Sequence, residues 1–314
     1  MEIPQWKDVL EAHERISPWV HRTPVFTCRA INSITGSELV FKCENLQKVG
    51  AFKFRGATNA VLALDNAFAE NGVATHSSGN HAAALALAAR NRGIKAHIVM
   101  PETSPRTKRE AVAGYGADIT FCAPTLEARE TTLDKVVSET GAAFIHPYNN
   151  FNVICGQATA ARELLEDTGP VDIVMVPVGG GGLLSGTAIT VRNMRPGTRV
   201  IAAEPKNADD AFRSFKTGVL QPPLKPNTVA DGLLTALGSL TFKITMEYVD
   251  DIICAGEESI IMAMRLIWER MKLIAEPSSA VPLAVILENR GLFEGKRIGI
   301  ILTGGNVDLD RLPF

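Results

Sequence analysis

The chain has 314 residues, more than one hydrophobic core usually holds, so we expect two domains rather than one. An apolar fraction of 46% and a charged fraction of 21% are typical of a folded globular protein and exclude a disordered or fibrous one. The net charge of −2 creates no field that would attract nucleic acid or a membrane surface. A basic stretch at Arg106, Lys108 and Arg109 is interpreted as a solvated helix face without a binding role.

The five cysteines are scattered and never spaced as C-x-x-C, so the sequence predicts neither a disulfide framework nor a thiolate metal site. The first residues form an amphipathic helical pattern and lack the apolar core of a signal peptide. An uncharged run over residues 173–191 contains a proline and four glycines, which favours a buried strand, turn and helix over a membrane span. We therefore expect a cytoplasmic protein with reduced thiols and no membrane partner.

Apolar runs alternate with helical patterns along the chain. After the first helix, we expect strands at 39–43, 73–76, 96–100, 119–122, 142–145, 173–176, 200–203 and 298–302, with helices that begin near Lys53 and Asn80 and others between the later strands. This alternation predicts an α/β fold with parallel sheets covered on both faces. Ligands bind beyond the carboxyl ends of such strands, so we expect the functional site in the loops that follow them.

The loop after the strand at 173–176 contains Gly179, Gly180, Gly181 and Gly182, followed by a helix. Four glycines let the backbone turn tightly and direct N–H groups and a helix amino terminus at an anion. The segment predicts a site for a phosphate, but it matches neither the dinucleotide fingerprint nor the P-loop, so it gives little support to a dinucleotide or a triphosphate. The alternative, a merely tight turn, rarely needs four glycines.

Two further loops are rich in polar groups. Residues 77–81 are Ser-Ser-Gly-Asn-His, after a strand and before a helix, where a carboxylate can bind while Asn80 or Ser78 reaches a reacting atom. Simple helix capping is the alternative. Residues 303–306 are Thr-Gly-Gly-Asn after the last strand and supply a hydroxyl, although alone they would be interpreted as a turn.

Lys53 lies at the expected start of a helix between apolar neighbours. Partial desolvation disfavours an ammonium, and a neutral amine is the nucleophile that Schiff-base chemistry needs. From this segment alone, a solvated lysine is the alternative.

In order and spacing, these four motifs resemble those of the fold-type II pyridoxal-phosphate enzymes, which include serine racemase and the threonine and 3-hydroxyaspartate dehydratases. The resemblance extends from about residue 10 to residue 312. It implies a tryptophan synthase β-like fold with two open, twisted, mostly parallel sheets flanked by helices. It also implies a large cofactor-binding domain over 1–71 and 150–314 and a small mobile domain over 72–149.

The resemblance also implies roles for individual residues. Lys53 would hold pyridoxal 5'-phosphate as a Schiff base and transfer a proton, with Phe52 beside the ring. Gly179, Gly180, Gly181 and Gly182 would bind the phosphate, Asn80 the ring hydroxyl oxygen and Thr303 the pyridine nitrogen. The substrate would meet Ser77, Ser78, Gly79, His81 and Arg129, with Ser78 acting opposite Lys53.

A divalent-cation site of the racemase group matches Glu204, the carbonyl of Ala208 and Asp210. Two carboxylates and a carbonyl within one turn suit a hard cation, magnesium first and calcium or manganese next. Solvated acids are the alternative.

The resemblance and the chemistry of the site together predict the reaction. A hydroxyl at Thr303 cannot keep the pyridine nitrogen protonated, which favours β-elimination over transamination. Ser78 stands where simple threonine dehydratases have alanine, which favours racemases or hydroxyaspartate-type enzymes, and Arg129 can accept a second carboxylate. We expect dehydration and deamination of 3-hydroxyaspartate, or of serine or threonine, to a 2-oxo acid and ammonia.

Other activities stay open. A serine or aspartate racemase is the close alternative, a β-replacement synthase is further off, and a catalytically silent amino-acid-binding homologue is a different class. Ala82, Ala83 and Tyr148 depart from the animal racemases, which weakens the case for activation by a nucleotide. The family expectation is a homodimer.

Overall fold

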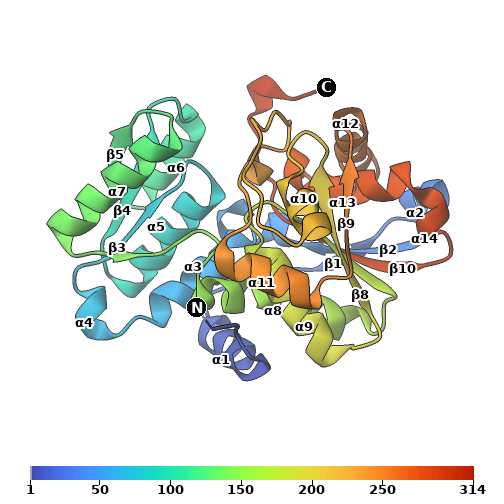
Figure 1. Cartoon of the computed structure of the whole chain (residues 1–314), viewed down its shortest axis with the longest axis horizontal. Coiled ribbons are helices and arrows are strands. Elements are labelled where there is room, and N and C mark those ends of the chain that lie inside the picture. Colours follow the sequence, from blue (N-terminus) through green and yellow to red (C-terminus); the bar gives the residue numbers. More distant parts are fainter. Residues whose placement is uncertain (1) are drawn as a thin grey trace.

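The computed structural model describes residues 2–314, apart from the side chain of Thr107. The chain forms two lobes, each built on its own sheet (Figure 1). The larger sheet has the order β1-β2-β10-β7-β8-β9 and the smaller one the order β5-β4-β3-β6. Within the described chain, β1 and β2 pair antiparallel and the other neighbouring strands pair parallel. The predicted α/β class with two mostly parallel sheets is confirmed.

The strands are β1 (Val25–Thr27), β2 (Glu38–Cys43), β3 (Val73–His76), β4 (Ala96–Pro101), β5 (Asp118–Cys122), β6 (Ala143–Phe144), β7 (Ile173–Pro177), β8 (Arg199–Pro205), β9 (Asp251–Ala255) and β10 (Arg297–Leu302).

The helices of the first half are α1 (Trp6–Ile16), α2 (Arg29–Thr35), α3 (Lys53–Leu62), α4 (Asn66–Ala69), α5 (Asn80–Arg92), α6 (Arg106–Gly114), α7 (Leu126–Thr140) and α8 (Phe151–Thr168). Those of the second half are α9 (Gly182–Met194), α10 (Asp210–Thr217), α11 (Ser239–Tyr248), α12 (Glu257–Leu266), α13 (Pro277–Glu288) and α14 (Arg290–Phe293), with short turns η1 (Glu44–Leu46), η2 (Lys48–Gly50), η3 (Asp231–Leu233), η4 (Ile267–Met271) and η5 (Leu309–Arg311). Among the described helices, none combines the length and the apolar character that crossing a membrane demands.

The eight predicted strands are all present, but the one expected at 142–145 is shorter. β6 keeps two residues because it is an edge strand that pairs with β3 through Ala143 and Phe144 alone. β1 and β9 were not predicted, since β1 has three residues and β9 begins at Asp251 and is only half buried. The uncharged run over 173–191 forms β7 and α9, as expected.

The larger sheet is buried on both faces, which explains why its strands are continuous apolar runs. Alternate residues of β7 point to opposite faces: Ile173 and Met175 pack in one cluster with residues of α12 and α13, and Val174 and Val176 pack in another with residues of α8 and α9. The loops at the ends of these strands are therefore held by a core on either side.

Helix α3 lies between the two lobes. Phe54, Ala57 and Val61 pack in the core of the smaller lobe with α5. Arg55 is fully buried and pairs with Glu44 and Glu163, with guanidinium-to-carboxylate distances of 2.7 Å to each. A buried ion pair of this kind constrains geometry more than it adds stability, because each charge loses its water. Helix α3, which begins at Lys53, is thus held by contacts with both lobes.

Candidate active site

The lysine segment and the last strand's loop lie side by side. The Phe52 N–H donates to the Thr303 carbonyl at 2.9 Å, and Ala51 forms an isolated antiparallel bridge with Gly304. Both segments follow the carboxyl ends of neighbouring strands, β2 and β10. The structure therefore brings Lys53 and Thr303 to the same edge of the sheet, where the alternating pattern predicted a site.

Lys53 is half-buried, and its Nζ donates to the Pro147 carbonyl at 3.0 Å. The same nitrogen lies 5.2 Å from the centre of the Phe52 ring. Burial lowers the pKa of Lys53 to about 8, and the carboxylate of Glu276 partly offsets this by raising it. A neutral amine is therefore accessible near neutral pH, as the sequence led us to expect.

The glycine loop at the end of β7 needs its glycines for definite reasons. Gly181 has φ +84°, in the left-handed region, and a Cβ there would lie 2.6 Å from Leu237. A Cβ on Gly180 would lie 2.3 Å from the Tyr148 ring. Helix α9 begins at Gly182, and one turn later the buried hydroxyl of Ser185 has no hydrogen-bond partner in the described part of the chain. A close-fitting cradle at a helix amino terminus with a spare donor suits a phosphate.

Asn80 is the first residue of α5, and its side chain crosses to the larger lobe. Its Nδ2 donates to both carboxylate oxygens of Glu276, at 3.2 and 3.0 Å, and its Oδ1 accepts from Asn306 Nδ2 at 2.9 Å. Glu276 is buried, which raises its pKa to about 7. The sequence indicated Asn80 but missed Glu276, whose one local signal is a proline at the start of the following helix.

The hydroxyl of Thr303 is buried in a network with Ser279. The two hydroxyl oxygens are 2.9 Å apart, and Ser279 Oγ also accepts from the Gly304 N–H at 2.7 Å. These contacts hold the Thr303 hydroxyl in place as a buried, uncharged polar group at this edge of the sheet.

The predicted substrate loop begins where β3 ends. The residues Ser77, Ser78 and Gly79 are half-buried, and the Gly79 N–H bonds weakly to Ser77 Oγ at 3.4 Å. His81 is buried, its Nε2 lies 3.3 Å from the Ile145 carbonyl, and burial lowers its pKa well below the ordinary value. His81 is therefore neutral, and its Nδ1 is unpaired among the residues described.

Arg129 stands in the first turn of α7, near the same loop. The pKa of His76, the last residue of β3, is lowered mainly by burial, and the positive charge of Arg129 lowers it further. The Nε of Arg129 is buried and makes no hydrogen bond within residues 2–314. An unpaired guanidinium nitrogen beside the substrate loop suits a carboxylate ligand.

The turn after β6 borders the lysine and was missed by sequence reasoning. His146 Nδ1 accepts from the backbone N–H groups of Tyr148 and Asn149, at 3.3 and 3.0 Å. Burial lowers the pKa of His146 to about 4, so the ring is neutral and holds its proton on Nε2. The Tyr148 ring lies against Gly180, and its Cβ and backbone lie against Gly182, so this departure from the animal racemases falls beside the glycine loop.

Glu204 and Asp210, two of the three predicted cation ligands, are buried at the end of β8. Both oxygens of Glu204 accept backbone N–H groups of α10, from Ala211 at 2.8 Å and Phe212 at 2.7 Å. Burial raises the pKa of Glu204 to about 9 and that of Asp210 to about 6. Asp210 Oδ2 is buried without a partner in the described chain, and Ala208, the third predicted ligand, is also buried. These features fit a hard cation, whose positive charge would compensate the two buried carboxylates.

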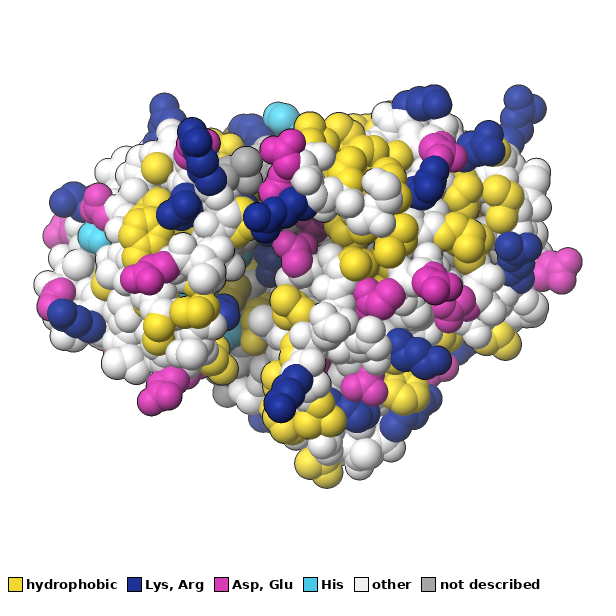
Figure 2. Space-filling model, turned by 90° about the horizontal axis from the view of Figure 1, so that it is seen from above, with side chains coloured by type: hydrophobic (Ala, Val, Ile, Leu, Met, Phe, Trp, Pro, Cys, Tyr) yellow, Lys and Arg dark blue, Asp and Glu magenta, His cyan; other side chains and the backbone are white. Residues whose placement is uncertain are grey.

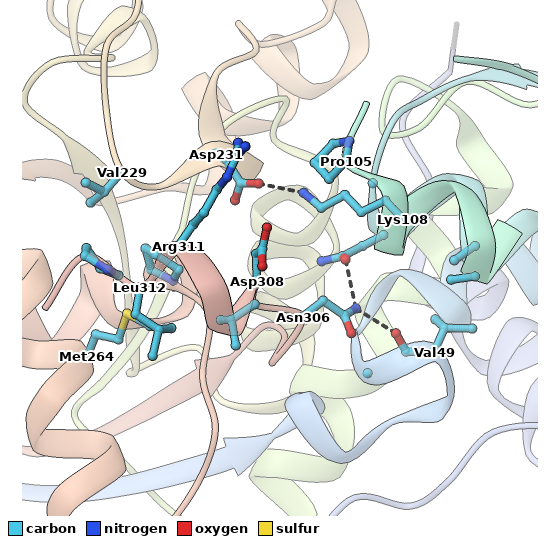
Figure 3. A pocket seen from close by; sticks show the side chains of 18 of the residues that line it. Val49, Pro105, Lys108, Val229, Asp231, Met264, Asn306, Asp308, Arg311 and Leu312 are labelled. Carbon is cyan, nitrogen blue, oxygen red and sulfur yellow. Dashed lines mark hydrogen bonds and ion pairs between the residues drawn. The ribbon is translucent and has the colours of Figure 1, made fainter. Parts of the chain in front are cut away.

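A cavity of about 570 Å³ lies between the lobes, and Asn80 and Asn306 are among the residues that line it. The surface is hollowed there, with basic and acidic side chains at the rim (Figure 2). In Figure 3, Lys108 of α6 reaches across the cavity to Asp231 of η3, with Nζ and Oδ2 2.7 Å apart. From the sequence, Lys108 was interpreted only as part of a solvated helix face, since its partner lies 123 residues away in the chain, on the other lobe.

Taken together, the lysine, the glycine cradle and the uncharged hydroxyl of Thr303 fit a pyridoxal-phosphate site on a fold-type II scaffold. Residues 16–304 match the family model described as pyridoxal-phosphate dependent enzyme, and the chain belongs to that family.

Two relatives and one solved structure narrow the comparison. The beta-hydroxyaspartate dehydratase of Paracoccus denitrificans (strain Pd 1222) is 54% identical over 314 residues, 100% of both chains. The serine racemase of Dictyostelium discoideum is 51% identical, over 98% of this chain and 96% of that protein. The structure of maize serine racemase has a TM-score of 0.96 at 45% identity, covering 98% of this chain and 95% of that one.

Proposed function

We propose that this enzyme dehydrates and deaminates small β-hydroxy amino acids, 3-hydroxyaspartate first, to a 2-oxo acid and ammonia. The observation on which this depends is Lys53: its amine has a pKa lowered to about 8, and its segment bonds to Thr303 at the edge of the sheet where the neighbouring strands β10 and β7 end. Bound pyridoxal phosphate supplies the electron sink for cleavage of the bond to the α-hydrogen.

The residues of the chain then have separate tasks. Lys53 would hold the cofactor and move the α-proton, because a neutral amine can accept one at physiological pH. Phe52 would flank the ring, Gly179 to Gly182 with the start of α9 would hold the phosphate, Asn80 would meet the ring hydroxyl oxygen, and Thr303 would meet the ring nitrogen. An uncharged hydroxyl at that nitrogen favours expulsion of the β-hydroxyl over transamination.

The guanidinium of Arg129, near the predicted substrate loop, favours a substrate with two carboxylates. We assign the substrate's α-carboxylate to the loop of Ser77, Gly79 and His81 at the start of α5. The unpaired Nε of Arg129 would then take the second carboxylate. The similarity to the Paracoccus dehydratase, whose name states a β-hydroxyaspartate substrate, supports the same choice.

Racemisation of serine is the second candidate. Ser78 supports it, because a hydroxyl opposite Lys53 would return the α-proton from the other face. Serine and threonine elimination are further candidates, and the similarity to serine racemases fits this alternative.

We also propose a divalent cation, magnesium first, on Glu204, the Ala208 carbonyl and Asp210. The buried, unpaired Asp210 Oδ2 supports this, since a cation would compensate the burial of two acids. We further propose a cytoplasmic homodimer with a small mobile domain over 72–149; the five cysteines are unpaired in the described structure, which suits a reducing compartment.

One substrate panel tests the proposed reaction and the proposed cation. The purified enzyme is incubated with serine, threonine and both diastereomers of 3-hydroxyaspartate, with magnesium or with a chelator, and 2-oxo acid, ammonia and substrate chirality are followed. We expect the highest kcat/KM for one diastereomer of 3-hydroxyaspartate and a lower melting temperature with chelator. Faster formation of D-serine than of pyruvate would make racemisation the main activity.

Lys53→Ala is the matched control for that panel. It should lower turnover by roughly 10²–10⁴-fold or more, because it removes both the attachment point and the proton-transfer group. Borohydride reduction followed by peptide mapping should label Lys53 in the native enzyme. A label on another lysine, or none, contradicts the proposed chemistry.

A further inference from the structure

The side chain of Asn80 has a partner on each side. Its Nδ2 donates to the Glu276 carboxylate, at 3.2 and 3.0 Å, and its Oδ1 accepts from Asn306 Nδ2 at 2.9 Å. A carboxylate only accepts hydrogen bonds, and an amide nitrogen only donates them. Turning the Asn80 amide over would therefore set oxygen against oxygen and N–H against N–H, and both bonds would be lost.

Asn306 is itself held in one orientation. Its Nδ2 donates to the Val49 carbonyl at 2.8 Å (Figure 3). A carbonyl oxygen cannot donate, so the nitrogen of Asn306 must face Val49, and the same nitrogen then reaches Asn80. Val49 has φ +58°, a strained conformation for a β-branched residue, and it lies four residues before Lys53. The bond from Asn306 therefore also ties down the turn that leads into the lysine helix.

Glu276 is fixed just as closely. Its side chain is 5% exposed, and its backbone N–H donates to the Gly304 carbonyl at 2.9 Å. A Cβ on Gly304 would lie 2.8 Å from the carboxylate, so this glycine leaves room for it. Gly305 is needed for a similar reason, since a Cβ there would lie 2.6 Å from the Ile274 carbonyl. The Thr-Gly-Gly-Asn loop thus supplies Thr303, the space for Glu276 and the donor of Asn306.

We infer that Glu276 and Asn306 are positioning residues that orient the Asn80 amide and leave one Nδ2 N–H for the cofactor's ring hydroxyl oxygen. The inference rests on the proposed function, because it takes Asn80 as a ligand of that oxygen. An amide carries two N–H groups, and the Glu276 carboxylate takes one of them. With the opposite orientation, a carbonyl oxygen would face the ring oxygen and could donate no hydrogen bond to it.

The test compares isosteric variants. N306D keeps the shape but replaces the donor to Asn80 Oδ1 by an acceptor that repels it, and E276L removes the acceptor of Asn80 Nδ2. In either variant Asn80 keeps one of the two partners that set its orientation and loses the other, so we expect both to weaken cofactor binding about tenfold, the loss of one hydrogen bond to a charged group. Both should also shift the absorbance spectrum of the bound cofactor in the same direction as N80A. E276Q, which retains an acceptor, should change affinity less than threefold, roughly a fraction of one such bond.

Two controls separate this role from a structural one. D308N changes another acidic side chain of the same cavity, whose Oδ1 accepts from Asp310 N at 3.1 Å, and should leave the spectrum unchanged. The double variant N80A/N306D should bind the cofactor no more weakly than N80A, because the two residues act through one amide. Melting temperatures of the cofactor-free chains show which variants fold.

The outcomes differ in what they overturn. A folded N306D protein with the native spectrum and affinity, while N80A is altered, rules out the positioning role and leaves the proposed function intact. N80A behaving like the native enzyme also rules out the positioning role. A native chain that holds no cofactor on Lys53 overturns the proposed function and this inference with it.

Discussion

The amine of Lys53 experiences two opposing influences. Burial lowers its pKa to about 8, and the Glu276 carboxylate raises it. Pyridoxal phosphate is captured by the neutral amine, so its rate of capture by the cofactor-free chain should rise with pH and level off above about pH 8. Replacing the carboxylate by an amide in E276Q removes the raising influence, so the midpoint should move to lower pH. Absorbance stopped-flow measurements across pH give both midpoints.

Those measurements would contradict the assignment if the midpoint lay near the ordinary lysine value of about 10.4. They would also contradict it if E276Q moved the midpoint upward, because removing a nearby negative charge can only disfavour an ammonium.

Single residues were predictable from the sequence where their type limits their use. A lysine between apolar neighbours, a run of glycines and a polar loop before a helix each have few explanations. Glu276 and Asn306 lacked such a signal, since a residue before Pro277 and an asparagine in a turn are ordinary. Their common partner Asn80 is 196 residues from Glu276 in the chain, a proximity that only the folded arrangement of α5 and α13 creates.

At the scale of elements, the strand, glycine loop and helix at β7–α9 act as a unit. Gly180 is not among the glycines with positive φ, so the 2.3 Å approach of an added Cβ to the Tyr148 ring decides its identity. G180A should displace that ring, lower stability by about 1–3 kcal/mol and weaken cofactor binding. Urea unfolding and equilibrium titration with pyridoxal phosphate measure the two effects.

Gly197 provides the matched control, because no heavy atom lies within 4 Å of a Cβ added there. G197A should leave both quantities unchanged. The cost of G180A should shrink in a Y148A background, where the overlapping ring is absent. An equal cost in both backgrounds would show that Tyr148 is not the reason for this glycine.

The same scale explains which elements could be predicted. β3, α5 and β4 have sharp ends, where apolar runs meet glycine or polar clusters, and their expected positions are confirmed to within a residue or two. β9 begins at Asp251, and Cys254 within it is half-buried, so its pattern does not alternate cleanly. Its place at the edge of the sheet comes from pairing with β8. Tertiary pairing, which sequence periodicity does not contain, made it a strand.

For the whole molecule, the question is how the two lobes meet. Lys108 on the smaller lobe pairs with Asp231 on the larger one at 2.7 Å, with side chains 28% and 54% exposed. Asn80 makes further cross-lobe contacts, with Glu276 and Asn306. If the smaller lobe closes over the substrate, as we propose, the ion pair favours the closed form by the modest amount of a half-exposed pair, about 0.2–1 kcal/mol.

K108M should therefore raise KM by about two- to fivefold, which corresponds to that energy, with a smaller change in kcat. Salt screens a half-exposed pair, so raising ionic strength should raise KM in the native enzyme and much less in K108M. The charge swap K108D/D231K should restore a low, salt-sensitive KM. R106M is the control: it removes a basic side chain of the same helix whose partner, Glu110, lies on that helix, so it cannot influence closure. The same salt dependence of KM in K108M and the native enzyme would show that this pair does not hold the lobes together, and that closure depends on Asn80 and the substrate.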